Sequence, residues 1–283
     1  MGRAMADRLL SGGHDLMVYN RTADKSSALI ARGAQAAATV AQAAAYAGVV
    51  LTMLADDAAL TAVSQGRDGL IGALPTGGIH VVMGTHGVQV VRSLAAAHAQ
   101  AGQVLLAAPV LGRPEAVTAG KLGVIVAGDA AAIARCRPLF ESLGRRVFAA
   151  GSDPGSAAAI KLANNLLLAC AIEAMGEAFS LVRKCGVDGN LFHDVITDGL
   201  FASPAYNGYA RIIADQSWDH AGFTVELALK DVSLALAAGA GAAVPMPSVN
   251  VCRDRLLGAL SHGDGQLDWA AMALEQARAS GLS

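Results

Sequence analysis

The sequence predicts an α/β domain built on a parallel sheet, followed by a domain made of helices. Up to about residue 150, short β-rich runs alternate with helix-length stretches. The runs 49–53 and 79–83 are almost continuously apolar, which is typical of strands covered on both faces. After the turn-forming segment 151–155 the strand pattern stops. We therefore expect a boundary near residue 153, with domains at 1–153 and 154–283.

The individual elements follow from periodicity and from capping residues. Thr22, Thr39 and Asp129 precede helical stretches, and their side chains suit a helix N-cap. The expected strands are 15–19, 48–53, 79–83, 104–107, 122–127 and 146–149. In the second domain the expected helices are 156–184, 189–198, 204–215, 225–238, 247–261 and 269–279.

Composition excludes several classes of protein. The net charge is −2, and the longest run of basic residues is Arg145-Arg146, so no nucleic-acid partner is expected. The best candidate for a membrane span, 162–179, contains two asparagines and two glutamates, which favours a buried helix and no membrane partner. Seven histidines show no metal-ligand spacing, so no metal is expected.

The N-terminal segment lacks the apolar run of a signal peptide. The four cysteines are widely separated, as in reduced thiols of a cytoplasmic protein. We expect a cytoplasmic protein. The surplus of apolar residues in the second domain also predicts that a second copy completes its core, in a homodimer or a larger homo-oligomer.

The opening residues are typical of the helix that follows a dinucleotide-binding loop. Gly2 fits the third glycine of the G-x-G-x-x-G pattern, which lets the helix pack closely on the sheet. The first two glycines and the strand before them are missing. In the Rossmann strand order that strand lies in the middle of the sheet, so its loss leaves interior neighbours unpaired. We therefore hypothesise that the natural product begins about ten residues before Met1.

The segment after the next strand predicts the form of the cofactor. This is where a Rossmann fold places the side chain that recognises the adenosine ribose. Asn20, Arg21 and Thr22 offer no carboxylate for the 2′-hydroxyl of NAD, whereas the Arg21 guanidinium suits a 2′-phosphate. NADP is therefore expected in preference to NAD.

Six motifs, in this order and spacing, resemble the β-hydroxyacid dehydrogenase family, which includes 3-hydroxyisobutyrate dehydrogenase, glyoxylate/succinic semialdehyde reductase and, as relatives, 6-phosphogluconate dehydrogenase and imine reductases. The similarity extends from residue 1 to about 275. The motifs are Met1-Gly2 to Leu10, Tyr19-Asn20-Arg21, Thr52-Met53-Leu54-Ala55-Asp56, Ala108-Pro109-Val110 with Gly112, Gly155 to Lys161 with Leu162-Ala163-Asn164-Asn165, and Leu229-Lys230-Asp231.

The resemblance implies that Lys161 is the general acid/base and that Asn165 orients the substrate. Residues four apart share a helix face, so an ammonium and an amide can converge on one oxygen. The apolar neighbours of Lys161 are expected to desolvate its ammonium and to lower its pKa. Asn164 is the alternative substrate contact if the helix face is rotated.

The resemblance also implies the other contacts of the cofactor. Leu54 and Ala55 are expected at its ribose, Thr85 and His86 near the nicotinamide, and Lys230 as a contact from the second domain. The family usually has proline where Ala55 stands. His86 has a second interpretation, as a titrating acid near neutral pH.

The sharpest departure from the family lies in the expected substrate loop, Val110, Leu111, Gly112 and Arg113. Relatives that act on hydroxyacids commonly have Ser-Gly-Gly after Pro-Val, which holds a substrate carboxylate. Here Leu111 replaces the serine and Arg113 the second glycine. Arg113 is expected either to bind a carboxylate bidentately or to turn outward, leaving an apolar pocket for an aldehyde, a ketone or an imine.

The leading hypothesis is an NADP-dependent oxidoreductase that transfers hydride between nicotinamide and a small aldehyde, keto acid or β-hydroxyacid, with Lys161 as acid/base. One alternative is reduction of C=N bonds, as in imine reductases. Another is a catalytically impaired dimerisation or binding module, because the first strand and two loop glycines are absent.

Overall fold

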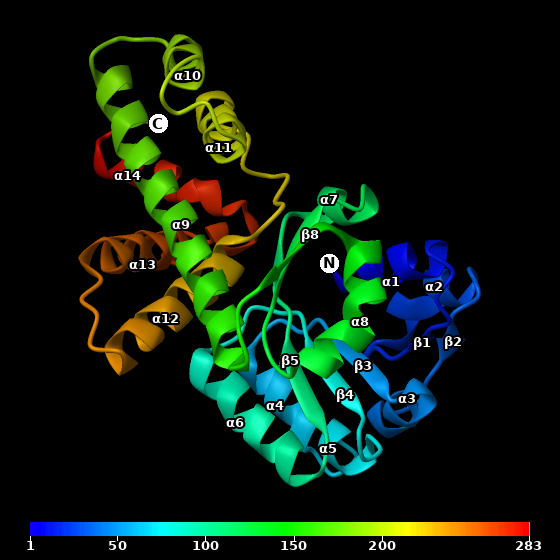
Figure 1. Ribbon diagram of the computed structural model, residues 1–283. Coiled ribbons are helices and arrows are strands. Elements are labelled where there is room, and N and C mark those ends of the chain that lie inside the picture. The colour runs from blue at the N-terminus through cyan, green and yellow to red at the C-terminus, as the bar shows by residue number, and fades with distance from the viewer. Residues whose placement is uncertain (283) are drawn as a thin grey trace. The chain divides into compact units, whose positions relative to one another are not determined.

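The computed structural model describes residues 1–282 and divides the chain into two compact units, Met1–Lys161 and Leu162–Ser283. The first unit contains every strand described, and the second is helical, as expected for a Rossmann-type domain followed by an all-α domain. The dividing point lies inside a helix, α9 (Pro154–Lys184), and not in the turn before it (Figure 1).

The first unit carries three small sheets. Parallel pairing joins β1 to β2, joins β3, β4 and β5 in that order, and joins β7 to β8, while β6 pairs antiparallel with β7. Mutual hydrogen bonds between Ala107 and Ala127 connect the second sheet to the third. The strands are β1 (Met17–Val18), β2 (Gln35–Ala36), β3 (Val49–Thr52), β4 (Ile79–Val82), β5 (Val104–Ala107), β6 (Val110–Leu111), β7 (Leu122–Val126) and β8 (Gly144–Ala149).

The six expected strands are present, each within a few residues of its expected bounds. Two short strands, β2 and β6, were not expected. Among the described residues no strand joins β1 to β3, so β3 is an edge strand of its sheet. Accordingly Val49, Val50 and Leu51 of β3 are only half-buried, whereas all four residues of β4 are buried.

Alternation along the strands divides the core of this unit between two faces. Ile79 and Val81 of β4 pack with α1 and α8, while Val82 packs with α4 and α6. Thr39, Asp56 and Asp129 cap α3, α4 and α8 through their side-chain oxygens, two of them as expected. The helices are α1 (Gly2–Ser11), α2 (Ser27–Ile30), α3 (Val40–Ala47), α4 (Asp57–Gln65), α5 (Leu70–Ala73), α6 (Val88–Gln100), α7 (Pro114–Thr118) and α8 (Ala130–Leu143).

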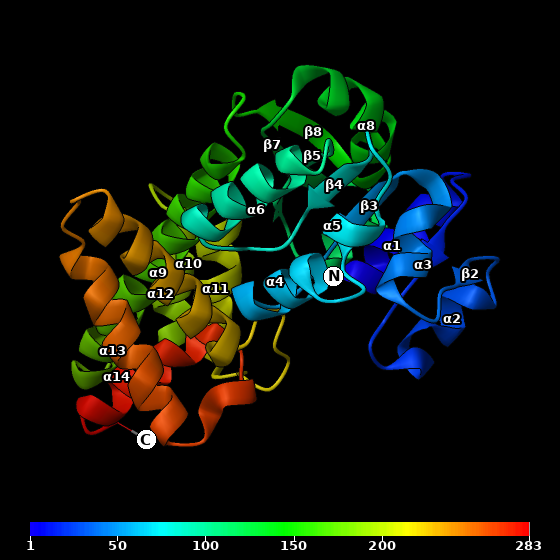
Figure 2. The ribbon, with the colours of Figure 1, turned by 90° about the horizontal axis from the view of Figure 1, so that it is seen from below.

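In the second unit α9 contacts every other helix, and Figure 2 shows α12, α13 and α14 beside it. Gly176 on α9 lies so close to α14 that a Cβ there would be 2.9 Å from Ala273 Cα. Only glycine permits this approach. The helices are α10 (Gly189–Thr197), α11 (Pro204–Asp215), α12 (Val225–Gly241), α13 (Pro247–Ser261) and α14 (Met272–Ala279).

By length and composition alone α9 could cross a membrane. It is nevertheless a packed core helix in this structure. Glu173 is buried and accepts a hydrogen bond from Arg255 of α13 at 2.9 Å, and Phe179 stacks edge-on against Phe192 of α10. Burial raises the pKa of Glu173, against the opposing effect of the Arg255 guanidinium.

A buried chain of hydrogen bonds crosses the face of the first unit that carries α6. His80 lies 2.9 Å from Thr52 Oγ1 through Nε2 and 2.9 Å from His98 Nε2 through Nδ1. His98 Nδ1 lies 2.7 Å from Gln103 Oε1, and the Gln103 amide donates to the carbonyl of Leu74 at 2.6 Å. With both imidazoles neutral, this order of donors places the proton of each on Nδ1.

We expect this chain to make the first unit sensitive to acid. Desolvation lowers the pKa of His80 well below its usual value near 6.5, with a further contribution from His98, and desolvation also lowers the pKa of His98. The unfolded chain therefore binds protons that the folded chain does not, and stability falls as pH falls below about 6.5. Each histidine contributes up to about 1.4 kcal/mol per pH unit.

The measurement is hydrogen exchange of the β4 and β5 amides at pH 7.5, 6.5 and 5.5. The double variant His80→Leu with His98→Leu should lose most of the pH slope, whereas His220→Gln, at an exposed position, should keep it. Equal slopes in the wild type and the double variant would contradict the assignment.

Candidate active site

The expected general acid/base and its neighbours lie on successive turns of α9. Lys161 is half-buried, Asn165 is 8% exposed, and the two share a helix face because they are four residues apart. The Asn164 amide donates to Asn165 Oδ1 at 3.2 Å. The structure therefore joins both asparagines in one polar cluster at the turn that follows Lys161.

Asp231 on α12 fixes the orientation of this cluster. Its side chain is 2% exposed, and its Oδ2 accepts a hydrogen bond from Asn165 Nδ2 at 2.6 Å. Lys230 Nζ lies 2.8 Å from the other oxygen. A bond to a buried carboxylate is strong, about 1.5–3 kcal/mol, so the amide of Asn165 is held in one rotamer. The nitrogen points at Asp231, and the oxygen faces Asn164.

A role was expected for Lys230 but not for Asp231. The motif Leu229-Lys230-Asp231 contains both residues, but the family resemblance implied a ligand contact for Lys230 alone. The available signal was a carboxylate at a core-facing helical position, because such a group is rarely buried without a partner. Lys230 is paired with this carboxylate at the asparagine cluster.

The expected cofactor contacts of the first unit lie at the carboxyl ends of two adjacent parallel strands. Leu54 and Ala55 follow β3, and Thr85 and His86 follow β4. Ala55 is exposed, Leu54 and Thr85 are half-buried, and His86 is buried. In doubly wound folds ligands bind in the crevice at this edge of the sheet.

Gly2 lies against the same edge. A Cβ on Gly2 would be 3.4 Å from Met53 Cβ, directly before Leu54, so the start of α1 packs closely on the loop after β3. The first turn of α1 contains no acidic residue and receives no side-chain cap. A helix N-terminus of this kind suits a pyrophosphate. These residues therefore fit a dinucleotide, although two glycines of the usual loop are absent from the chain.

Asn20, Arg21 and Thr22 form an exposed turn after β1, in which the Thr22 amide donates to Asn20 Oδ1 at 2.9 Å. Asn20 therefore stabilises the turn, and the guanidinium of Arg21 is at the surface. Within this turn the cation is the group with the charge to contact a phosphate.

The expected substrate loop is partly a strand. Val110 and Leu111 form β6, paired with Val124 and Gly123 of β7, and the Val110 side chain is buried in the core. Gly112 has φ +137°, and Arg113 is the N-cap of α7. Any contact between Val110 and a substrate would therefore come from its backbone, and Arg113 lies at the end of the strand.

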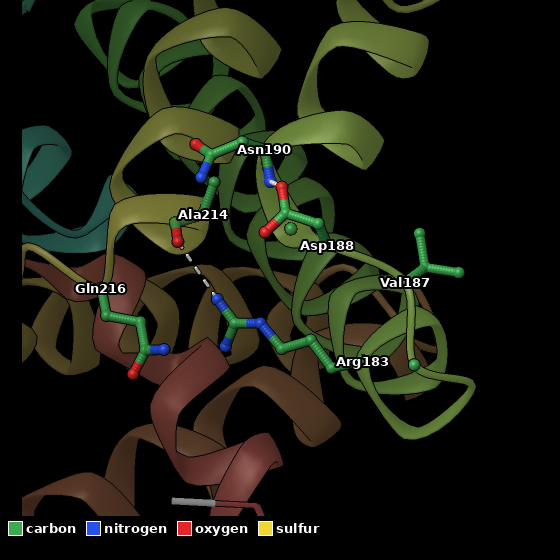
Figure 3. Close-up of a pocket in the computed structure, with 8 residues that line it drawn as sticks. Arg183, Val187, Asp188, Asn190, Ala214 and Gln216 are labelled. Carbon is green, nitrogen blue, oxygen red and sulfur yellow. Dashed lines mark hydrogen bonds between the residues drawn. The ribbon is translucent and has the colours of Figure 1, made fainter.

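A surface hollow of about 470 Å³ lies elsewhere in the second unit, between the start of α10 and the end of α11 (Figure 3). Arg183 donates to the carbonyls of Ile213 and Ala214 there, and Asp188 caps α10. The charged groups thus complete two helix ends, and none of the expected site residues lines this hollow. Among the described residues no cluster of metal-ligating side chains is found.

Two family models cover almost the whole chain. The NAD-binding domain of 6-phosphogluconate dehydrogenase matches residues 1–151, and the NAD-binding domain of NADP-dependent 3-hydroxyisobutyrate dehydrogenase matches residues 155–275. The chain belongs to the β-hydroxyacid dehydrogenase family and is an NAD(P)-dependent oxidoreductase of that class.

Two curated relatives are similar over almost their full length. An uncharacterised oxidoreductase of Bacillus subtilis, YfjR, is 42% identical over 96% of this chain and 95% of its own. The NAD-dependent L-serine dehydrogenase of Pseudomonas aeruginosa is 32% identical over 96% of this chain and 93% of its own.

Solved structures are consistent with membership of the β-hydroxyacid dehydrogenase family. The 3-hydroxyisobutyrate dehydrogenase of Mycobacterium tuberculosis, determined with L-serine, is 26% identical with a TM-score of 0.87, covering 97% of this chain and 94% of its own. A reductive aminase of Aspergillus terreus is also 26% identical, but its TM-score is 0.63 over 96% of this chain and 94% of its own.

Proposed function

We propose that the protein is an NADP-dependent oxidoreductase that transfers hydride between nicotinamide and a small aldehyde, keto acid or β-hydroxyacid. The observation that carries the proposal is the buried bond between Asn165 and Asp231, one helical turn from Lys161. It presents an ammonium and a fixed amide from one helix face. When bound, the nicotinamide supplies or accepts the hydride at the substrate carbon.

Lys161 in this proposal donates a proton to the substrate oxygen during reduction and removes it during oxidation. Its charge stabilises the oxyanion that develops as the carbonyl carbon is reduced. Asn165 orients the substrate, and Asp231 keeps its amide from rotating. Lys230 balances the buried carboxylate of Asp231 at 2.8 Å, so that negative charge is not left unpaired near the reacting oxygen.

The cofactor contacts are proposed at the carboxyl ends of β3 and β4. Gly2 and the start of α1 receive the pyrophosphate, Leu54 and Ala55 the ribose, and Thr85 and His86 the nicotinamide side. Lys230 is a further proposed contact. Val110, Leu111, Gly112, Arg113 and Asn164 are proposed on the substrate side.

Reduction of C=N bonds is the second candidate. Leu111 in place of the family's serine removes a hydroxyl donor for a carboxylate, which favours an apolar substrate. Relatives named L-serine dehydrogenase and 3-hydroxyisobutyrate dehydrogenase are 32% and 35% identical, against 26% for the reductive aminase, which supports C=O chemistry first. A screen of glyoxylate, succinic semialdehyde, L-serine and a cyclic imine, each with NADP and NAD forms, tests the two against each other.

The proposal includes a homodimer formed through α9. Exposed apolar side chains recur every seven residues along this helix, at Ile160, Leu167, Ala174 and Leu181. Leu167 is 68% exposed and Leu181 is 65% exposed. A stripe with this spacing extends about 30 Å along one helix face and suits the same stripe of a second copy. We also propose a reducing, cytoplasmic location, which the four free cysteines support.

Lys161→Ala tests the proton donor. We expect kcat to fall by about 10²–10⁴-fold, the usual contribution of a general acid, while the dissociation constant for NADPH changes by less than about threefold. Stopped-flow turnover and titration of nicotinamide fluorescence measure the two quantities. Lys184→Ala, at an exposed position near the end of the same helix, is the matched control, and near-normal turnover of Lys161→Ala would remove Lys161 from this role.

Arg21→Ala tests the choice of cofactor. Losing a charge-assisted contact to the 2′-phosphate should weaken NADPH binding by about 10- to 150-fold, since such contacts contribute about 1.5–3 kcal/mol, and should leave NADH binding unchanged. Lys25→Ala, four residues along the exposed segment, should affect neither. Equal losses for both cofactors, or none, would argue against NADP preference through Arg21.

Leu167→Glu tests the dimer. A carboxylate in the middle of the α9 stripe should shift the protein toward monomer in sedimentation velocity, because its desolvation opposes association. Leu200→Glu places the same charge at a fully exposed leucine outside the stripe and should leave the mass unchanged. An unaltered mass for Leu167→Glu would exclude this face as the interface.

A further inference from the structure

A side-chain bridge joins the two loops that follow β3 and β4. Asp57 is the first residue of α4, directly after the loop that leaves β3. His86 and Gly87 lie in the loop that leaves β4, and Gly87 is the N-cap of α6. Because β3 and β4 are neighbouring parallel strands, this bridge lies at the carboxyl edge of the sheet. We call Asp57, His86 and Gly87 the loop clasp.

One carboxylate makes all the contacts of the clasp. Asp57 Oδ1 lies 3.0 Å from His86 Nδ1 and accepts from the Gly87 amide at 3.1 Å, while its Oδ2 is 3.2 Å from the same amide. The Asp57 carboxylate thus bonds the His86 imidazole and the backbone N–H of Gly87, the N-cap of α6. Such charge-assisted bonds hold the three residues in fixed relative positions. The carboxylate therefore sets the separation of the two loops.

The buried position of the His86 imidazole lowers the stability of the folded protein. The residue is 1% exposed, and its Nε2 has no hydrogen-bond partner among residues 1–282. Leaving such an atom unpaired costs about 1–3 kcal/mol. Space for the ring depends on Gly84, since a Cβ there would lie 2.5 Å from Nε2 and 2.8 Å from the carbonyl oxygen of Leu54. A leucine at position 86 would avoid the unpaired nitrogen, so stability alone does not favour histidine.

The positions that the clasp holds are the ones proposed to contact the cofactor. Leu54 and Ala55 are three and two residues before Asp57, and Thr85 directly precedes His86. We propose that Asp57 and His86 are positioning residues, which hold the loops after β3 and β4 at the separation that a dinucleotide requires. This inference rests on the proposed function. It adds that cofactor affinity depends on a bond between two protein side chains.

Replacing His86 separates positioning from simple structural support. His86→Leu removes the donor to Asp57 and also the unpaired Nε2. We expect the dissociation constant for NADPH to rise about tenfold and the melting temperature to remain at or above that of the wild type. His86→Asn keeps an N–H at the position of Nδ1 and should restore affinity to within threefold.

Asp57→Ala tests the other half of the clasp. It should weaken NADPH binding by at least tenfold and speed hydrogen exchange at the Gly87 amide, which loses its acceptor. Asp56→Ala is the matched control. Asp56 caps α4 through the Ala59 amide at 2.7 Å, so its loss should cost about 1 kcal/mol of stability without changing the affinity for NADPH.

The outcomes are distinct. An unchanged affinity in His86→Leu, or a melting temperature that falls below the wild type without rescue by His86→Asn, would show that the pair is only structural and would overturn the inference. Failure of the wild-type protein to bind either NADPH or NADH would instead overturn the proposed function. Faster exchange at Gly87 with unchanged affinity would confirm the contact but reject its role in binding.

Discussion

The second unit depends on close packing around α9. Separate turns of this helix contact each of the other helices: Asn165 meets α12, Glu173 meets α13, Gly176 meets α14, Phe179 meets α10, and Arg183 reaches the end of α11. Because these contacts follow one another at the helical rise of 1.5 Å per residue, a shift of α9 would disturb all of them together. The orientation of Asn165 is therefore fixed by the packing of the whole unit.

The two units differ in how their buried polar side chains are paired. In the first, Thr52, His80, His98 and Gln103 form a neutral chain in which each donor meets an acceptor. In the second, buried carboxylates are paired with cations, as Asp231 is with Lys230 and Glu173 with Arg255. The neutral chain is buried between the sheet and α6, where an ion would be costly. The Lys230–Asp231 pair contacts Asn165, one helical turn from the proposed proton donor, where an ion can influence chemistry.

This division suits an oxidoreductase of the β-hydroxyacid dehydrogenase family. Strand ends and helix N-termini of the first unit provide backbone N–H groups and small residues, which suit a dinucleotide. On α9 and α12 lie the amine proposed to transfer a proton and the amide and carboxylate proposed to orient the substrate. The loop clasp belongs with the groups that suit a dinucleotide, because Asp57, His86 and Gly87 all lie in the first unit.

Local sequence determined most of the elements. Hydrophobic periodicity and capping residues are properties of short segments, so α11 and α13 have the expected bounds, and Thr39 and Asp129 cap the helices they precede. The resemblance of several motifs, taken in order, was enough to indicate the family. The same local signals placed Lys161 and Asn165 on one helix face.

Only the tertiary structure decided which distant groups meet. The strands β2 and β6 have two residues each, too few for a periodic pattern, and they are defined by pairing with β1 and β7. Asp231 and Asp57 lie 66 and 29 residues from Asn165 and His86, and nothing in either segment alone names its partner. Periodicity reports which face of an element is buried, whereas a hydrogen bond between elements depends on how those faces are packed.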